Sequence, residues 1–326
     1  MIQVKNLTKI YKTPIKEPGL KGSVKSLFHT EYKEKIAVDN VSFSMNEGQT
    51  LACIGENGAG KSTLIKMLIG ILTPNSGDIQ IFGRAPTQRA QEYLRQIGVT
   101  FGQKSNLWID IPVIESYMAM KTLYKVDEKE FKQNYDMVVE LLDLSEILQS
   151  PARKLSLGQR MKADIGMLFL HSPKILYLDE PTIGLDINVK YTIRSFIRKM
   201  NQEKNVSVFL TSHDLDDIDE ICSDALVLSQ GRIFYDGSLK DLKHRFVTEK
   251  TVKVVGKEKN DIKTLLPQAD ITSDPQKTTI IYDTTLYTSE QILSAISKSY
   301  DIDDITIQEP DIDYVVSKIF KQGGGQ

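Results

Sequence analysis

One stretch decides the fold of this 326-residue chain: Thr50-Leu51-Ala52-Cys53-Ile54-Gly55-Glu56-Asn57-Gly58-Ala59-Gly60-Lys61-Ser62-Thr63-Leu64. A short apolar run ends in a glycine-rich loop, and the loop ends in Lys-Ser-Thr. An amphipathic segment at helical spacing follows the loop. The pattern fits the phosphate-binding loop G-x-x-x-x-G-K-[ST], which requires this strand-loop-helix context. We therefore expect a phosphate-binding loop rather than a glycine-rich turn with a chance lysine.

The expected chemistry of this loop follows from its residue types. Glycines let the backbone bend tightly and approach phosphates closely, and successive backbone N–H groups then form a concave anion site. A helix that begins near Lys61 adds the positive end of its dipole. We expect Lys61 to reach the β- and γ-phosphates of a nucleotide and the Ser62 hydroxyl to bind Mg²⁺. The loop residues expected to hold the nucleotide are Gly55, Glu56, Asn57, Gly58, Ala59, Gly60, Lys61, Ser62 and Thr63.

Length and composition bound the class of protein. The 326 residues suffice for one large domain and a small one, and the 40% hydrophobic content supports a buried core. A net charge of −2 argues against a general nucleic-acid binder. The two cysteines do not form a disulfide scaffold and favour a reducing compartment. No signal peptide or membrane-spanning run is found, which predicts a soluble chain whose membrane role comes through a partner or surface contact.

A lysine-rich insertion, residues 12–35, separates two expected strands, residues 2–7 and 37–45. It carries six lysines and three glutamates, together with two prolines and two glycines. We interpret it as a solvated surface loop with one short helix. The alternative is a basic amphipathic element that lies near an anionic membrane face or a partner.

Further strands are expected at residues 78–82, 97–101, 175–178 and 207–212, with a helix at 88–96 and helical structure throughout 112–149. The strand at 175–178 is mainly aliphatic and runs into Asp179 and Glu180, and the strand at 207–212 leads to His213. Ligands bind at the carboxyl ends of such parallel strands. Ser156 is a good N-cap for an apolar helix that continues to about residue 170, and a helix N-terminus favours an anion.

These motifs, in this order, resemble the nucleotide-binding subunit of ATP-binding cassette (ABC) transporters over about residues 1–240. The resemblance rests on the phosphate-binding loop combined with four further motifs: Leu155-Ser156-Leu157-Gly158-Gln159, Leu178-Asp179-Glu180-Pro181, Gly184-Leu185-Asp186 and Ser212-His213-Asp214. It implies an α/β fold, a P-loop NTPase core of the ABC-ATPase type in residues 1–245, with a helical subdomain at about 110–172.

The resemblance also implies roles for residues that bind ATP and Mg²⁺ in one subunit. Tyr11 matches the aromatic residue that stacks on adenine. Gln103 matches a glutamine that contacts Mg²⁺ and the attacking water and senses the permease. Asp179 matches the aspartate that holds Mg²⁺, and Glu180 matches the general base. His213 matches the switch histidine beside the γ-phosphate.

Other matching residues act across a dimer in this family. Ser156, Gly158 and Gln159 match the signature motif, which touches the γ-phosphate of ATP bound to the opposite subunit, and Asp186 matches the loop that crosses the interface. One cassette per chain therefore implies a homodimer that holds two ATP molecules. The signature departs from the usual Gly-Gly pair because Leu157 precedes Gly158. The resemblance still implies ATPase activity, but the added bulk of the Leu157 side chain leaves the rate of hydrolysis open.

Residues 246–326 are expected to form a small α/β accessory domain. Strands are predicted at 251–255, 278–282 and 302–308, with helices at 261–266 and 289–299. The domain carries nine lysines and thirteen acidic residues, so a net charge of −4 makes nucleic-acid binding unexpected. Similar tails in export cassettes are regulatory or stabilise the dimer; the alternative is a simple stabilising appendage.

The sequence therefore predicts a peripheral ATPase subunit at the cytoplasmic face of the cell membrane. It would homodimerise on ATP and drive separate polytopic membrane permease subunits, as part of an exporter. One alternative is a non-transport cassette ATPase that acts on ribosomes or nucleic acid, although such chains typically carry two cassettes, long coiled coils or zinc motifs. Another is a nucleotide-binding regulator that does not hydrolyse ATP, against which Glu180 and His213 both argue.

Overall fold

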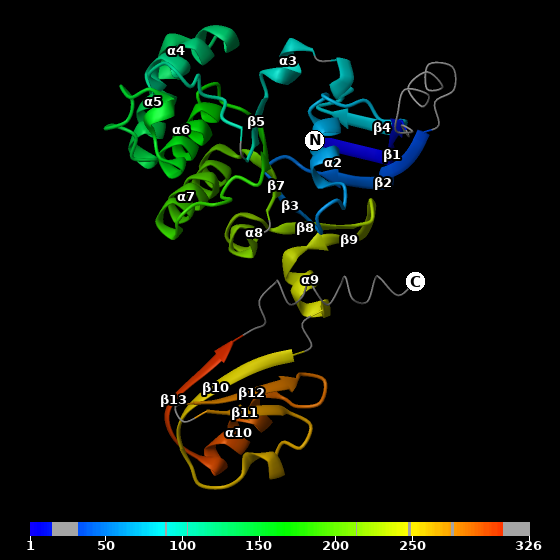
Figure 1. Cartoon of the computed structure of the whole chain (residues 1–326), viewed down its shortest axis with the longest axis vertical. Coiled ribbons are helices and arrows are strands. Elements are labelled where there is room, and N and C mark those ends of the chain that lie inside the picture. Colours follow the sequence, from blue (N-terminus) through cyan, green and yellow to red (C-terminus); the bar gives the residue numbers. More distant parts are fainter. Residues whose placement is uncertain are drawn as a thin grey trace, which may run out of the picture. The chain divides into compact units, whose positions relative to one another are not determined.

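The computed structural model describes residues 1–14, 32–88, 90–102, 104–212, 214–246, 249–274 and 277–308. The chain divides into two compact units, Met1–Leu239 and Lys240–Gln326 (Figure 1).

A six-stranded sheet organises the large unit, with its strands in the order β5-β6-β7-β3-β8-β9. Neighbours from β5 to β8 pair in parallel, and β9 pairs with β8 in the antiparallel direction. Every residue of β3 and β7 is buried, as expected for strands covered on both faces. Because these strands are parallel, their carboxyl ends meet at one edge of the sheet. The strands are β3 (Thr50–Gly55), β5 (Ile97–Phe101), β6 (Ile175–Asp179), β7 (Ser207–Thr211), β8 (Asp224–Ser229) and β9 (Arg232–Ser238).

A second, antiparallel sheet has the order β2-β1-β4 and consists of β1 (Ile2–Pro14), β2 (Tyr32–Met45) and β4 (Ser76–Ile81). Helix α2 (Lys61–Leu68) contributes its apolar face to a core that includes residues of both sheets. Leu64 and Leu68 of α2 belong to the same buried cluster as Met45 of β2 and Tyr177 of β6. The glycine-rich loop is therefore held between a rigid strand and a helix that is packed on its apolar side.

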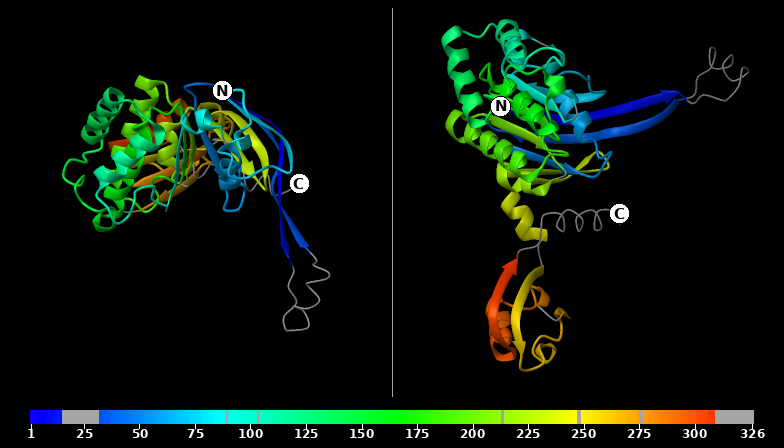
Figure 2. Two further views of the ribbon diagram at one scale, coloured as in Figure 1. Left: turned by 90° about the horizontal axis from the view of Figure 1, so that it is seen from above. Right: turned by 60° about the vertical axis from the view of Figure 1, so that its left-hand side comes forward.

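The ends of the lysine-rich insertion are strands, so the predicted surface loop is wrong at residues 12–14 and 32–35. Figure 2 shows β1 and β2 side by side as they extend together. Tyr11 pairs with Lys35, and Lys12 pairs with Glu34 in register. The Lys12 ammonium lies 2.9 Å from the Glu34 carboxylate, so opposite charges meet across the strands. Residues 15–31, on which the short helix and the basic amphipathic alternative fall, lie outside the described residues.

The helical segment is interrupted, so the prediction of helix throughout residues 112–149 is wrong in part. Helix α4 (Val113–Tyr124) ends at Lys125 in a left-handed conformation, and Asp127 caps α5 (Glu128–Leu141) by accepting from Lys129 N–H at 2.9 Å. Residues 142–150 are not helical. The prediction that Ser156 is a helix N-cap is confirmed, because Ser156 and Gln159 form a capping box at the start of α6 (Leu157–Phe169).

The remaining helices of the large unit complete its layers. The helix predicted at 88–96 shortens to α3 (Gln91–Leu94) after the 3₁₀ turn η1 (Pro86–Gln88), whereas the strand at 97–101 is confirmed as β5. The others are η2 (Ala152–Lys154), α7 (Ile187–Lys204) and α8 (Leu215–Ile221), and α9 (Leu239–Phe246) spans the division between the units. Among the described helices, none is both long and apolar enough to cross a bilayer.

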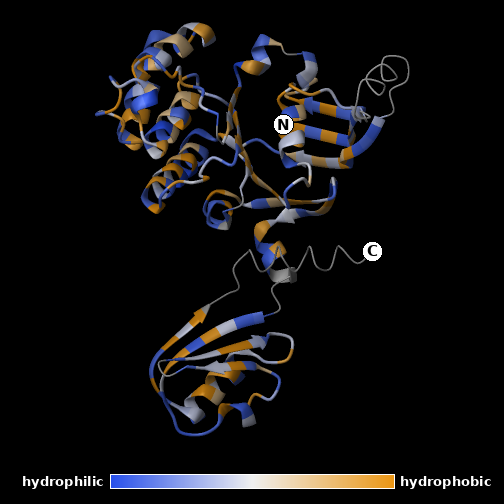
Figure 3. Cartoon of the chain, in the orientation of Figure 1, coloured by the Kyte–Doolittle hydropathy of each residue, from blue (hydrophilic) through white to orange (hydrophobic). Residues whose placement is uncertain are grey.

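The small unit is an antiparallel sheet in the order β11-β12-β10-β13, with helix α10 (Ser289–Ser299). Its own core joins Val252 and Ile280 of the sheet to Ile292 and Ile296 of α10. Figure 3 shows the mixture of apolar and polar residues along these elements. The helix predicted at 261–266 is only the turn η3 (Ile262–Thr264), and β11 was not expected. The strands are β10 (Glu249–Glu258), β11 (Asp270–Ser273), β12 (Thr278–Asp283) and β13 (Tyr300–Gln308).

Candidate functional site

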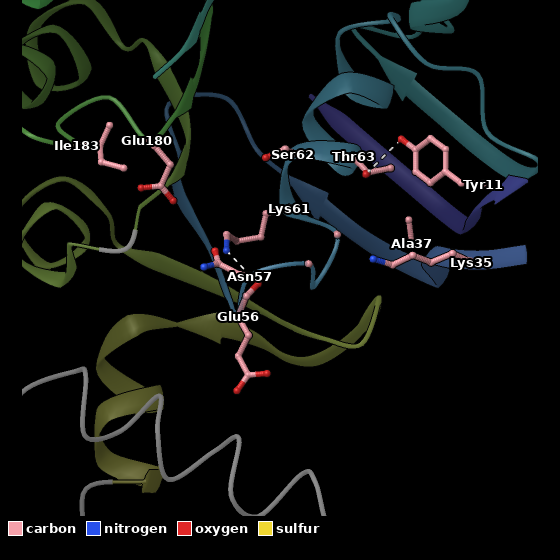
Figure 4. A pocket seen from close by; sticks show the side chains of 12 residues that line it. Tyr11, Lys35, Ala37, Glu56, Asn57, Lys61, Ser62, Thr63, Glu180 and Ile183 are labelled. Carbon is pink, nitrogen blue, oxygen red and sulfur yellow. Dashed lines mark hydrogen bonds between the residues drawn. The ribbon is translucent and has the colours of Figure 1, made fainter. Parts of the chain in front are cut away.

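A cavity of about 470 Å³ opens at the carboxyl end of β3 (Figure 4). Glu180 and Ile183 approach it from one side, and Tyr11, Lys35 and Ala37 approach from the other. The glycine-rich loop and the start of α2 lie between these two groups. The lining residues are Tyr11, Lys35, Ala37, Glu56, Asn57, Gly58, Gly60, Lys61, Ser62, Thr63, Glu180 and Ile183.

The loop conformation depends on glycine. Gly60 has a φ of 110°, and a Cβ at this position would lie 2.3 Å from the carbonyl oxygen of Ala37. Gly60 is also the N-cap residue of α2, so no side chain of its own occupies the helix N-terminus. The first N–H groups of α2 and the positive end of its dipole consequently face the cavity, which suits an anion.

Lys61 is the cation at this loop. Its side chain is only 7% exposed, and its ammonium donates to the carbonyl oxygens of Gly55 at 2.5 Å and Glu56 at 3.3 Å. These two hydrogen bonds hold the Lys61 ammonium against the glycine-rich loop. A buried positive charge therefore lies where the phosphates of a nucleotide would enter.

Ser62 and Asp179 bring oxygen ligands together beside Lys61. The Ser62 hydroxyl donates to Asp179 Oδ1 at 3.3 Å, and the Thr211 hydroxyl donates to the same oxygen at 2.6 Å. Mg²⁺ binds through one or two protein oxygens, completed by phosphates and water. The hydroxyl and carboxylate present here fit that donor set. Thr211 was not singled out from the sequence, and its only signal is a hydroxyl at the last position of a buried strand.

Glu180 lies on the turn that follows β6. Its backbone N–H donates to Thr211 O at 2.9 Å, and Gly102 N–H donates to Asp179 O at 2.6 Å. Glu180 has a φ of 56°, which is costly for a residue with a side chain. Figure 4 shows its carboxylate directed toward the side of the cavity where Lys61 lies. Such strain persists only where neighbouring groups fix the backbone.

Tyr11 forms the opposite wall. Its hydroxyl lies 3.4 Å from the Thr63 hydroxyl, and its ring remains partly exposed. Lys35, its cross-strand partner, also lines the cavity together with Ala37. Sequence reasoning missed Lys35 because its segment was interpreted as a loop. An exposed aromatic ring at a cavity wall is suited to stacking on a nucleobase.

The signature residues lie elsewhere in the described part of the chain and are not part of the cavity lining. Ser156 and Gln159 cap α6, and a Cβ on Gly158 would lie 2.9 Å from a Val189 methyl group. Asp186 caps α7 by accepting from Val189 N–H at 3.0 Å. Leu157 is exposed on the same α6 N-terminus. The predicted site residues Gln103 and His213 lie outside the described residues.

Cys53 lies on β3 directly before the loop but is not a reactive thiol. Burial raises its pKa to about 12, with Asp179 adding to the shift and Lys61 opposing it. The group therefore stays protonated at neutral pH and acts as a small apolar residue.

Comparison with known proteins identifies similar chains. Residues 38–183 match the family described as ABC transporter. The bacitracin transport ATP-binding protein BcrA of Bacillus licheniformis is 30% identical over 215 residues, which cover 66% of this chain and 69% of BcrA. The Nod factor export ATP-binding protein I of Cupriavidus metallidurans is 28% identical, over 77% of this chain and 82% of that protein. A solved ATP-binding subunit of an ABC transporter superposes with a TM-score of 0.62 at 25% identity, over 75% of this chain and 92% of that chain.

Proposed function

Because this chain belongs to the ABC transporter family of ATP-binding proteins and is an ATPase, we propose that the cavity beside Lys61 is where it hydrolyses ATP. The observation that carries the proposal is the convergence on one cavity of an anion site, a candidate base and an aromatic wall. We further propose that two copies act together and drive a separate membrane permease.

ATP enters with its triphosphate over the glycine-rich loop and its adenine against Tyr11. The N–H groups at the start of α2 and the Lys61 ammonium bind the β- and γ-phosphates. Lys35 lies on the Tyr11 side of the cavity, where its ammonium is available to the nucleotide. Ser62 and Asp179 would hold Mg²⁺, which when bound would supply positive charge to the phosphate oxygens. Gln103 and His213 keep the roles that the family resemblance assigns to them.

Glu180 activates the attacking water. Its carboxylate accepts a proton as the water oxygen bonds to the γ-phosphorus, while the bond from that phosphorus to the β–γ bridging oxygen breaks and releases ADP. Phosphoryl transfer needs mainly positioning and charge stabilisation. Lys61 stabilises the negative charge that develops on the transferred group.

A second copy of the chain would complete the site. Ser156, Gly158 and Gln159 lie at the N-terminus of α6, where the positive end of the helix dipole suits a γ-phosphate presented by another molecule. Exposed apolar residues support such an interface. They include Ile183 at the cavity and, on one face of α7, Ile187 and Tyr191. We propose a homodimer with two ATP molecules between the copies.

The permease partner is supported by a second cavity of about 510 Å³, lined mainly by apolar residues of α3, β5, α4, α6 and the segment that follows α2. Ile71, Leu94 and Leu123 are exposed around it. An apolar cavity with exposed walls suits a segment of another protein. We propose that polytopic permease subunits bind there and hold the chain at the cytoplasmic face of the membrane. The likeness to a Nod factor export protein supports export as the direction.

Glu180→Gln tests the assignment of the base. We expect this variant to bind ATP with Mg²⁺ but to hydrolyse it at least about 100-fold more slowly, because the amide cannot accept the proton. It should therefore accumulate as an ATP-bound dimer in size-exclusion chromatography, whereas ADP should not support the dimer. Glu203→Gln, at an exposed carboxylate near the end of α7, is the matched control and should behave as the unmodified chain. Normal turnover by Glu180→Gln would exclude Glu180 as the base.

The partner is tested by affinity purification of the chain from its own membranes, followed by mass spectrometry. We expect to recover a polytopic membrane protein. Substitution of Leu123 or Ile71, which line the second cavity, should weaken that recovery. Recovery of ribosomes or nucleic acid without such a protein would contradict the permease proposal while leaving the ATPase chemistry in place.

A further inference from the structure

Asp217 of α8 is a fully buried carboxylate outside the cavity lining. Three side chains from different elements donate to it. The Thr182 hydroxyl and the Ser212 hydroxyl both donate to Oδ2, the latter at 2.8 Å, and Arg194 Nε donates to Oδ1 at 2.6 Å. Each oxygen is therefore committed, which fixes the orientation of the carboxylate.

The two hydroxyls that share Asp217 Oδ2 belong to loops at the carboxyl edge of the large sheet. Thr182 follows β6 and lies two residues after Glu180, and Ser212 directly follows β7. Thr182 is itself buried, so its hydroxyl cannot exchange Asp217 for bulk water. Asp217 thus joins the loop that carries the proposed base to the neighbouring strand end.

Arg194 balances the buried negative charge and anchors the cluster to α7. It donates to Asp214 and to Glu220, each at 3.0 Å. Burial of the guanidinium opposes its charged form, but Asp217, Asp214 and Glu220 together raise its pKa above the usual value. Arg194 therefore remains a cation, and the pair with Asp217 is compensated.

The left-handed backbone at Glu180 needs such an anchor. Its φ of 56° is unfavourable for a residue with a Cβ, so the turn relaxes unless groups on both sides hold it. The backbone bond from Glu180 N–H to Thr211 O holds the start of the turn, and Thr182 holds the end through its side chain.

We infer that Thr182 and Asp217 are positioning residues for Glu180: the hydrogen bond between them fixes the turn that aims the Glu180 carboxylate at the attacking water. The inference rests on the proposed role of Glu180 as the base. Thr182 touches neither nucleotide nor water in this scheme and acts only through the turn. Its loss should slow the chemical step without weakening ATP binding, because the phosphate-binding loop belongs to a different part of the edge.

A hydroxyl deletion and its rescue provide the test. Thr182→Val keeps the shape but removes the donor, and Thr182→Ser keeps the donor. Thr192→Val removes a hydroxyl that donates to Asn188 O on the exposed side of α7, and is the matched control. For each variant kcat would be measured by phosphate release, Kd by titration with a fluorescent ATP analogue, and folding by thermal unfolding.

We expect Thr182→Val to lower kcat by about 10-fold or more while Kd stays within about two-fold, since small displacements of a reacting group have effects of this size. Thr182→Ser should restore most of the rate, and Thr192→Val should leave both constants unchanged. Thr182→Ala makes the same comparison if valine prevents folding. Unchanged kcat in folded Thr182→Val, or equal loss in Thr182→Ser, overturns the inference.

Glu180→Gln, assayed in parallel, separates this inference from the proposed function. If Glu180→Gln turns over ATP normally, the assignment of the base fails whatever Thr182 does. If Glu180→Gln stops turnover and Thr182→Val does not slow it, only the positioning role of Thr182 and Asp217 is overturned.

Discussion

Single glycines in the phosphate-binding loop differ in what surrounds them. Gly60 and Gly58 have φ values of 110° and 87°, so an added side chain strains either backbone. A Cβ on Gly60 would also meet Ala37 O at 2.3 Å, whereas a Cβ on Gly58 would have none of the described atoms within 4 Å. The two positions therefore separate backbone strain from collision with β2.

We expect Gly60→Ala to be the more damaging substitution. Gly58→Ala should lower the free energy of unfolding by about 1–2 kcal/mol, the cost of the left-handed backbone alone. Gly60→Ala should exceed that cost and lose ATP affinity by about 10-fold or more, because relief of the collision moves the loop and the start of α2 away from β2. Chemical denaturation and nucleotide titration of both variants measure the two effects. Equal loss in the two variants would contradict the role of Ala37 O.

At the residue scale, the sequence predicted those site residues whose chemistry is set by one local motif. The spacing around Lys61 predicted the loop, and the apolar strand before Asp179 predicted the edge at which it lies. Thr182 and Lys35 could not be found this way. Thr182 acquires its partner Asp217 through contact across 35 positions, and Lys35 reaches the cavity only because β2 pairs with β1.

At the scale of elements, two helices begin with the same capping box. Ser156 and Gln159 cap α6 in the large unit, and Thr288 and Gln291 cap α10 in the small unit. Each hydroxyl accepts from the N–H three residues on at 3.2 Å. The caps are therefore matched in geometry, while only Ser156 is proposed to touch ATP.

Alanine at either cap should lower the free energy of unfolding by about 1 kcal/mol. Ser156→Ala should also slow ATP hydrolysis. It removes a hydroxyl at the α6 N-terminus that we propose donates to the γ-phosphate of the ATP bound by the second copy. Thr288→Ala should leave hydrolysis unchanged. Denaturation curves and steady-state ATPase rates distinguish the two effects, and equal hydrolysis by both variants would argue against the signature role.

Element boundaries show where pattern reasoning fails. The parallel strands were predictable because burial on both faces produces continuous apolar runs such as Ile175–Leu178. The extension of β1 to Pro14 and of β2 back to Tyr32 was not predictable, because the lysines and prolines in this part of the sequence favour a loop locally. Cross-strand pairing, including Lys12 with Glu34, overrides that local preference.

At the scale of the whole molecule, each described sheet takes all its strands from one unit. The strands of the large unit end with β9 at Ser238, and the small unit builds its sheet and core from Glu249 onward. In the described chain the two sets of strands are not exchanged between units. A unit with its own core is able to fold alone.

A chain that ends at Phe246 should therefore fold and bind ATP. It keeps every described residue of the candidate site together with α9, and removes the described sheet of the small unit. We expect a cooperative unfolding transition and a Kd for ATP within about two-fold of the full chain, since the large unit has a hydrophobic core of its own. Nucleotide titration and thermal unfolding measure both. A 10-fold weaker Kd, or a chain that fails to fold, would mean that the small unit stabilises the ATP site, whereas an unchanged Kd with slower hydrolysis would place its action on the dimer.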